Sequence, residues 1–157
     1  MKVLVIVPCY NEANRLKASH FLDFANQHTD FQFLFANDGS RDNTLDIIRQ
    51  LSEEHPTMHY FDIQPNGGKG EAVRKAMLYA YENFHADYIA FWDADLAIPL
   101  NELVVFLNRI EEGFDIITAM RIRRLGANIE RGHVRHILSR SFATCASIAL
   151  DLPVYDT

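Results

Sequence analysis

VLVIVPCYNE, residues 3–12, places five consecutive apolar residues directly before a proline and a polar stretch. The apolar run is too short for the core of a signal peptide and far too short to cross a bilayer. It predicts a buried strand that ends where the polar residues begin. Because no targeting segment is evident, we expect a cytoplasmic domain.

The rest of the chain repeats this alternation of short apolar runs and amphipathic stretches. Strands are predicted over residues 3–7, 31–36, 58–63, 87–92 and 115–119. Helices are predicted over residues 43–52, 70–84, 100–112 and 131–150. Alternating strands and helices predict an α/β fold, with a mainly parallel central sheet and helices on both of its faces.

Composition and charge narrow the possible functions. The 157 residues are 48% hydrophobic, which suits one domain with a substantial core. A net charge of −6 argues against a nucleic-acid partner. Residues 121–140 nevertheless contain six arginines and one acid, which favours an anionic ligand or a membrane face, although a solvated helix face fits the charge equally well. We expect both cysteines, Cys9 and Cys145, to be buried thiols rather than a disulfide.

Polar residues follow each predicted strand. Ligands of parallel α/β sheets bind beyond the carboxyl ends of the strands, so these residues are expected to share one edge. They occupy positions 8–12, 37–40, 64–70, 93–95 and 120–121.

Asp93-Ala94-Asp95 is the strongest candidate for a metal site. Two carboxylates separated by one residue can address a single Mg²⁺ or Mn²⁺, which prefers oxygen ligands and leaves positions for substrate phosphates. The alternative is that Asp95 caps the following helix.

Two other loops are candidates for binding the ligand. Asp38 can accept a hydrogen bond from a nucleobase or a sugar hydroxyl, and we expect it to stay free while Asp42 or Asn43 caps the next helix. Lys69, in a glycine-rich stretch before a helix, suits an anion, although a simple turn is a fair alternative. The stretch is not a Walker A loop, because Gln64 and Gly70 replace required residues.

Together, these segments resemble the family-2 glycosyltransferases in their order and spacing. They are residues 7–12, 37–44, 66–74 and 93–99. Residues 95–99, the Arg121 region, Arg131 with Arg135, and Asp156-Thr157 are similar to the dolichyl-phosphate (polyprenyl-phosphate) glucosyltransferases. Ala97 favours glucosyl over mannosyl transfer, since the related mannosyltransferases usually carry Gln there. Cys9 and Met120 depart from the usual small residue and serine.

The resemblance implies a GT-A-type, Rossmann-like domain over residues 1–157 that binds a nucleotide sugar and is truncated on the acceptor side. It implies a metal held by Asp93 and Asp95. The substrate-binding residues that it implies are Pro8, Tyr10, Glu12, Asp38, Lys69, Asp93, Ala94 and Arg135. The catalytic residues that it implies are Asp95, Arg121, Arg131 and Asp156.

The expected reaction is an inverting, metal-dependent transfer of a hexose, glucose by preference, from a UDP-sugar. The expected acceptor is a polyprenyl or dolichyl phosphate, which would place the protein at the inner face of the membrane. Transfer from GDP-mannose or to a saccharide remains an alternative, as does a non-catalytic nucleotide-binding or interaction domain. A nucleotidyltransferase is disfavoured, because residues 8–12 lack the glycine-rich, basic loop expected after its first strand.

Overall fold

A computed structural model describes residues 1–110, 112–114, 116–118, 141–142, 144–145 and 147–148. The chain divides into two compact units, Met1–Val105 and Phe106–Thr157, which are treated separately. The predicted helix over residues 131–150 falls mostly outside the described residues, but those described between 141 and 148 are helical.

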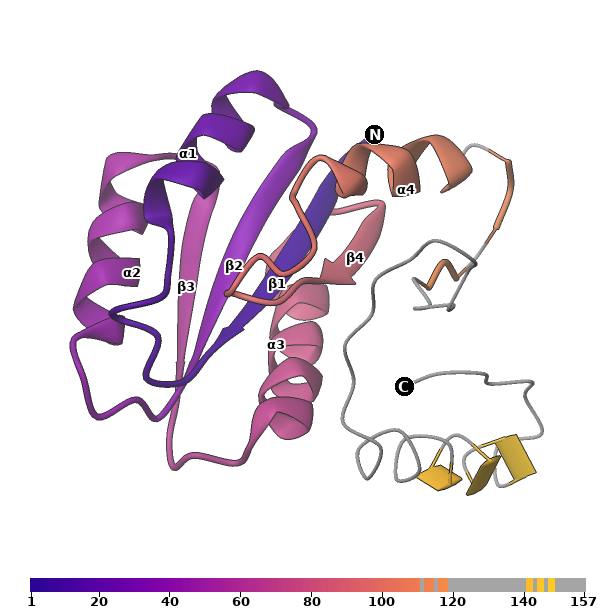
Figure 1. Cartoon of the computed structure of the whole chain (residues 1–157). Coiled ribbons are helices and arrows are strands. Elements are labelled where there is room, and N and C mark those ends of the chain that lie inside the picture. Colours follow the sequence, from indigo (N-terminus) through magenta and orange to yellow (C-terminus); the bar gives the residue numbers. More distant parts are fainter. Residues whose placement is uncertain (111, 115, 119–140, 143, 146, 149–157) are drawn as a thin grey trace, which may run out of the picture. The chain divides into compact units, whose positions relative to one another are not determined.

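Four strands alternate with four helices along the first 110 residues (Figure 1). In chain order the elements are β1 (Val3–Cys9), α1 (Ala18–Gln27), β2 (Phe31–Asp38), α2 (Thr44–Glu54), β3 (Met58–Ile63), α3 (Lys69–Asn83), β4 (Tyr88–Phe91) and α4 (Glu102–Ile110). The strands form one sheet in the order β3-β2-β1-β4, and every pairing is parallel. The predicted parallel α/β sheet is thus confirmed.

Helices cover both faces of this sheet, as predicted: α1 and α2 lie on one side and α3 on the other (Figure 1). Side chains alternate between the two faces of a strand, so each face buries a different set. On the α1 side, Phe21 packs edge-on against Phe33 and Phe35, with ring centroids 5.3 and 5.2 Å apart. On the α3 side, Leu4, Ile6, Leu34 and Ala36 pack with buried alanines of the helix.

Two predictions need correction, and one helix was missed. The helix α1 was not predicted, because its N-cap residue, Lys17, is not one of the residue types that usually cap a helix. A strand was predicted over residues 115–119, but residues 116–118 lie in irregular structure. Residues 115 and 119 are outside the described residues. Cys9 is buried as expected, but Cys145 is exposed on a helix. Neither cysteine forms a disulfide.

Within the part of the chain that the structure describes, none of the helices has the length and apolar character that crossing a membrane requires.

Candidate functional site

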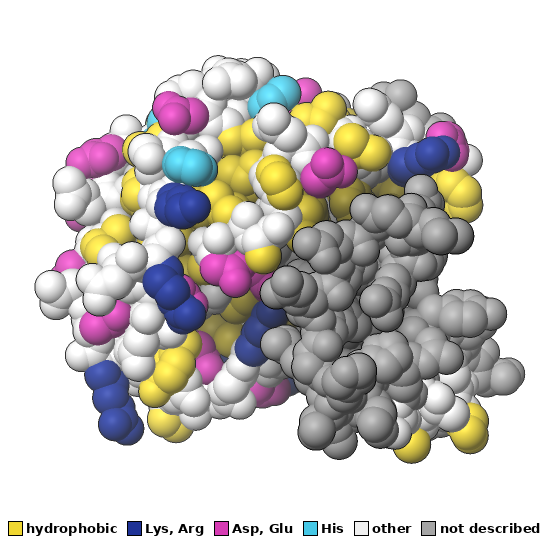
Figure 2. All heavy atoms as spheres, viewed as in Figure 1, with side chains coloured by type: hydrophobic (Ala, Val, Ile, Leu, Met, Phe, Trp, Pro, Cys, Tyr) yellow, Lys and Arg dark blue, Asp and Glu magenta, His cyan; other side chains and the backbone are white. Residues whose placement is uncertain are grey.

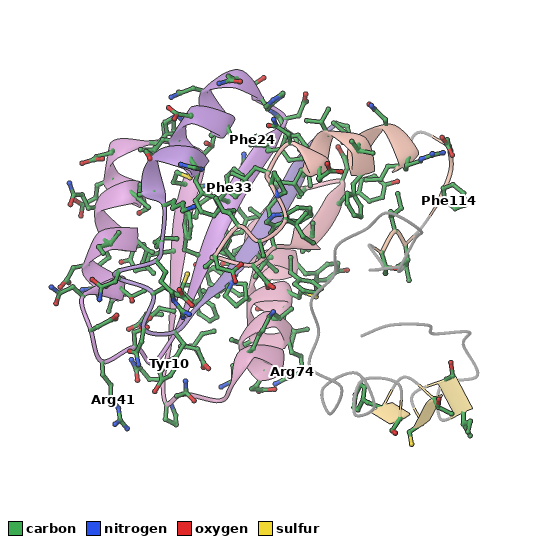
Figure 3. All side chains as sticks on the ribbon, in the orientation of Figure 1. Tyr10, Phe24, Phe33, Arg41, Arg74 and Phe114 are labelled. Atoms are coloured by element: carbon green, nitrogen blue, oxygen red, sulfur yellow. The ribbon has the colours of Figure 1, made fainter. Side chains whose placement is uncertain are left out.

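The carboxyl ends of all four strands lie at one edge of the sheet, because every pairing is parallel. The register brings Cys9 level with Asn37, and Asp38 level with Ile63. Figure 3 shows Tyr10 and Arg41, from the loops after β1 and β2, at this same end. The polar segments after β1 to β4 therefore lie at one edge, as predicted, whereas residues 120–121 lie outside the described residues.

The loop after β1 is fixed to the loop after β2 by hydrogen bonds. The backbone N–H of Asn11 donates to Ser40 Oγ at 3.0 Å, and Asn11 Oδ1 accepts from the Arg41 N–H at 2.8 Å. The Glu12 N–H donates to Thr44 Oγ1 at 2.8 Å. Asn11 has a φ of 53°, a left-handed conformation that asparagine tolerates well. These bonds hold Pro8, Tyr10 and Glu12 at the edge of the sheet. The sequence analysis did not identify Asn11 and Thr44 as functional residues, although an asparagine in a loop is a signal for such a turn.

Among the described residues, Glu12 is hydrogen-bonded through only one of its carboxylate oxygens. Arg15 donates to Glu12 Oε1 at 2.7 Å, whereas Oε2 is buried and accepts no hydrogen bond from the described residues. Burial, and secondly the charge of Glu12, raise the pKa of the neighbouring Cys9 thiol far above its usual range. Cys9 is therefore a protonated, unreactive thiol.

Asp38 is buried at the end of β2, with 2% of its surface exposed. Its Oδ1 accepts the Gly67 N–H at 2.9 Å, and its Oδ2 accepts the Gly68 N–H at 2.7 Å. Asn66 Nδ2 also donates to the Asp38 carbonyl at 2.7 Å. Both oxygens of Asp38 thus bind the loop before α3, and each keeps a second lone pair, so contact of Asp38 with a ligand stays a prediction.

Capping of α2 follows the prediction for Asp42 rather than Asn43. Asn43 is the N-cap residue but makes no side-chain cap bond, whereas Asp42 Oδ1 accepts the Thr44 N–H at 3.0 Å. Slight burial raises the pKa of Asp42, but hydrogen bonds from Thr44 and Ala13 outweigh this and hold that pKa below its usual range.

Lys69 and Asp93 form an ion pair between α3 and the residues after β4. Lys69 Nζ lies 2.6 Å from Asp93 Oδ1, and the two side chains are 59% and 47% exposed. Such exposure means that the pair adds little to stability. It does bring two of the predicted ligand residues into contact.

Asp95 closes a local turn instead of capping α4, which begins at Glu102. Its Oδ1 accepts the Ala97 N–H at 3.0 Å, and Leu96 has a φ of 52°. Trp92 secures the same turn by donating from Nε1 to the Ile98 carbonyl at 2.9 Å. Asp93 and Asp95 are exposed on either side of the buried Ala94.

This pair of carboxylates fits a hard divalent cation. Mg²⁺ commonly binds one or two carboxylates and takes its remaining ligands from phosphates and water. Among the described residues, no group of three or more His, Cys, Asp or Glu side chains is placed to hold a metal. Two carboxylates suit an ion that takes its remaining ligands from a bound phosphate and water.

Charges on the face shown in Figure 2 are mixed over the described part: basic and acidic side chains alternate and form no single patch. Four predicted residues, Arg121, Arg131, Arg135 and Asp156, lie outside the described residues.

Comparison with known proteins places these features in a family. The model of Glycosyl transferase family 2 matches residues 4–152. CsbB of Bacillus subtilis, itself only provisionally assigned as a glycosyltransferase, is 31% identical over 157 residues, covering 98% of this chain and 45% of CsbB. The undecaprenyl-phosphate 4-deoxy-4-formamido-L-arabinose transferase of Shewanella sediminis is 29% identical over 134 residues, covering 82% of this chain and 39% of that enzyme. The chain thus spans less than half the length of these relatives.

The parallel sheet with its flanking helices matches the GT-A glycosyltransferase fold, as in S. aureus TarS 1–349. The TM-score is 0.55 at 25% identity, and the match covers 71% of this chain and 33% of that of TarS. With a family model covering nearly all of its residues, the chain belongs to glycosyl transferase family 2.

Proposed function

We propose that this chain forms the donor side of a glycosyltransferase and binds a nucleoside-diphosphate sugar together with Mg²⁺ or Mn²⁺ at the carboxyl edge of its sheet. One observation carries the proposal: the 2.6 Å contact of Lys69 with Asp93, beside the exposed Asp95. A cation and two carboxylates from separate elements meet where ligands of parallel sheets bind. Such a set suits a diphosphate with its metal ion.

The neighbouring side chains suit the other parts of a nucleotide sugar. Tyr10 is 43% exposed and offers an aromatic face to a base. The Oε2 of Glu12, which has no partner in the described part of the chain, can accept a hydrogen bond from an N–H or a hydroxyl. A divalent ion held by Asp93 and Asp95 would neutralise charge on the departing diphosphate.

We propose UDP-glucose as the donor and a polyprenyl phosphate as the acceptor. Ala97 supports glucose through the family resemblance, and the Shewanella relative is named for an undecaprenyl-phosphate acceptor. A phosphate monoester is largely ionised at neutral pH, since its second pKa is about 6. It can attack the anomeric carbon, with inversion, without a strong general base. Transfer to a lipid phosphate would be recognised by labelled glucose that partitions into organic solvent.

Arg121, Arg131 and Arg135 are proposed to neutralise the two phosphate-bearing substrates, and Asp156 to orient the acceptor. Guanidinium groups suit this role because they bind phosphate oxygens in pairs. An acceptor of this kind would bring the protein to the inner face of the membrane.

The donor proposal is tested by thermal unfolding with UDP, GDP, UDP-glucose and GDP-mannose, each with Mn²⁺. At a concentration about 100 times Kd, a bound ligand should raise Tm by roughly 5–10 °C. UDP and UDP-glucose should produce this shift. A larger shift with the guanine nucleotides would reassign the donor, and no shift with any of the four would favour an interaction domain instead.

A further inference from the structure

We propose that Lys69 is the internal counter-ion of Asp93 and competes with a divalent metal ion for this carboxylate until a diphosphate draws Lys69 away. Lys69 thereby makes metal binding depend on the nucleotide. The inference rests on the proposed function, because it concerns the same donor and metal site. It assigns Lys69 a task in the free chain, in addition to contact with a bound phosphate.

The contact of Lys69 with Asp93 joins two segments that lie far apart in the sequence. Lys69 is the first residue of α3, and its Nζ lies 2.6 Å from Asp93 Oδ1, in the segment after β4. An ammonium group at hydrogen-bond distance offsets much of the charge of a carboxylate. One of the two proposed metal carboxylates is therefore already paired with a cation of the protein itself.

The pairing of charges on α3 explains why Lys69 reaches outside its own helix. Glu71, two residues further on, accepts two hydrogen bonds from Arg74, each at 2.7 Å. Lys75 Nζ also lies 3.9 Å from Glu71 Oε1. The acid in the first turn of the helix is thus bound by two other cations, which leaves Asp93 as the partner of Lys69.

Asp95 differs from Asp93 in its partners. Its Oδ1 accepts the Ala97 N–H at 3.0 Å, and no ion pair joins Asp95 to a cation in the described part of the chain. Both aspartates are exposed on either side of the buried Ala94. Asp95 is thus open to a metal ion, whereas Asp93 is shared with Lys69.

The exposure of the pair makes Lys69 a displaceable counter-ion. The two side chains are 59% and 47% exposed, and an ion pair in such contact with water is weak and screened by salt. The ammonium group sits on a flexible stem, so Lys69 can turn to another anion without movement of the helix. Repulsion between a divalent ion and an ammonium group on the same carboxylate should weaken metal binding by about three- to tenfold.

A nucleoside diphosphate relieves this competition. Its phosphate oxygens offer Lys69 another anionic partner and supply further ligands for a metal ion. Once Lys69 has left Asp93, this carboxylate is available to the metal. Because coupling between two ligands is reciprocal, nucleotide and metal should strengthen each other's binding by the same factor. The site therefore disfavours a metal ion without its nucleotide.

Electron paramagnetic resonance of free Mn²⁺, titrated with the 157-residue chain, measures this competition without turnover. In the absence of nucleotide, Lys69→Met should bind Mn²⁺ about three- to tenfold more tightly than the wild type. Lys69→Arg keeps the charge and should stay close to the wild type. Lys75→Met is the matched control, because it removes the same charge from the same helix but from beside Glu71. It should change the affinity by less than about twofold, since this charge does not contact Asp93.

The same titration with saturating UDP completes the test. The advantage of Lys69→Met over the wild type should then fall below about twofold, because Lys69 no longer competes for Asp93. An advantage that persists in full with UDP, no advantage without UDP, or an equal gain in Lys75→Met would overturn the inference alone. A wild-type chain that binds no Mn²⁺ even with UDP would contradict the proposed function and the inference together.

Discussion

At the scale of single residues, the buried polar groups at the carboxyl edge hold loops together. Asn37 and Thr44 are fully buried, and each bonds to a different segment: Asn37 to Asp62 and Thr44 to the backbone of Glu12. Asp38 does the same for the loop before α3. A polar motif after a strand therefore supplies both scaffold and ligand groups. The sequence does not separate these uses, because both need the same residue types.

Gly39 offers a direct test of how closely these loops pack. Gly39→Ala should lower the free energy of unfolding by about 2–4 kcal/mol. Alanine is strained in this backbone conformation, and its Cβ would also collide with a neighbouring backbone atom. The φ of Gly39 is +64°, and its Cβ would lie 2.8 Å from Asn66 N. Urea unfolding measures the change.

Two other glycines serve as graded controls. Gly68 has a φ of +84° and a ψ of 159° but no atom within 4 Å of its added Cβ, so Gly68→Ala should cost only the conformational strain, about 1–3 kcal/mol. Gly70 has open space and lies within α3, so Gly70→Ala should stabilise by up to about 1 kcal/mol. Equal losses at Gly39 and Gly68 would argue against close contact of the loops.

Cys9 gives the fold a dependence on alkaline pH. Burial raises the pKa of this thiol in the folded chain, so the unfolded chain loses its proton first. The contribution of the protonated Cys9 thiol to the free energy of unfolding is complete below about pH 8.5, the ordinary pKa of a thiol. At higher pH this contribution falls by about 1.4 kcal/mol per pH unit. Urea unfolding between pH 7.5 and 10 should show a steeper loss in the wild type than in Cys9→Ala. Cys145→Ala, which removes the exposed thiol, should keep the wild-type slope.

For the secondary-structure elements, the apolar runs in the sequence predicted the first residues of the strands more accurately than the last residues. Strands begin at Val3, Phe31 and Met58 as predicted, but β1 and β2 continue to Cys9 and Asp38. The polar ends are recruited by pairing with neighbouring strands, as Cys9 pairs with Asn37. This pairing is a tertiary effect and leaves no local signal in the sequence. The same holds for α1, whose place depends on Phe21 and Phe24 meeting the rings of β2.

Helix α3 lies close to the sheet because its buried face is built from small residues. Ala72, Ala76 and Ala80 are at most 1% exposed and pack with Leu4 and Ile6. Ala76→Leu should therefore overpack the core and lower the free energy of unfolding by about 2–3 kcal/mol. Tyr81→Leu, on the same helix but 83% exposed, should change it by less than about 0.5 kcal/mol. A tolerated leucine at 76 would show that this interface is loose.

At the scale of the whole molecule, the fold and the meeting of loops could be predicted from sequence, because a parallel sheet gathers all of its strand ends at one edge. The pairs formed there, such as Lys69 with Asp93, depend on tertiary geometry and emerge only from the structure. The proposed acceptor side rests on Arg121, Arg131, Arg135 and Asp156 and remains a prediction. The proposed donor and metal site lies on the first unit, Met1–Val105.

Calorimetric titration of UDP-glucose, with and without Mn²⁺, tests this proposed site. The wild-type chain should bind more tightly with Mn²⁺, and Asp95→Ala should lose this dependence, because one of the two metal carboxylates is gone. Asp23→Ala removes an exposed carboxylate from α1 and should behave as the wild type. Binding by Asp95→Ala that matches the wild type, both with and without Mn²⁺, would contradict the site.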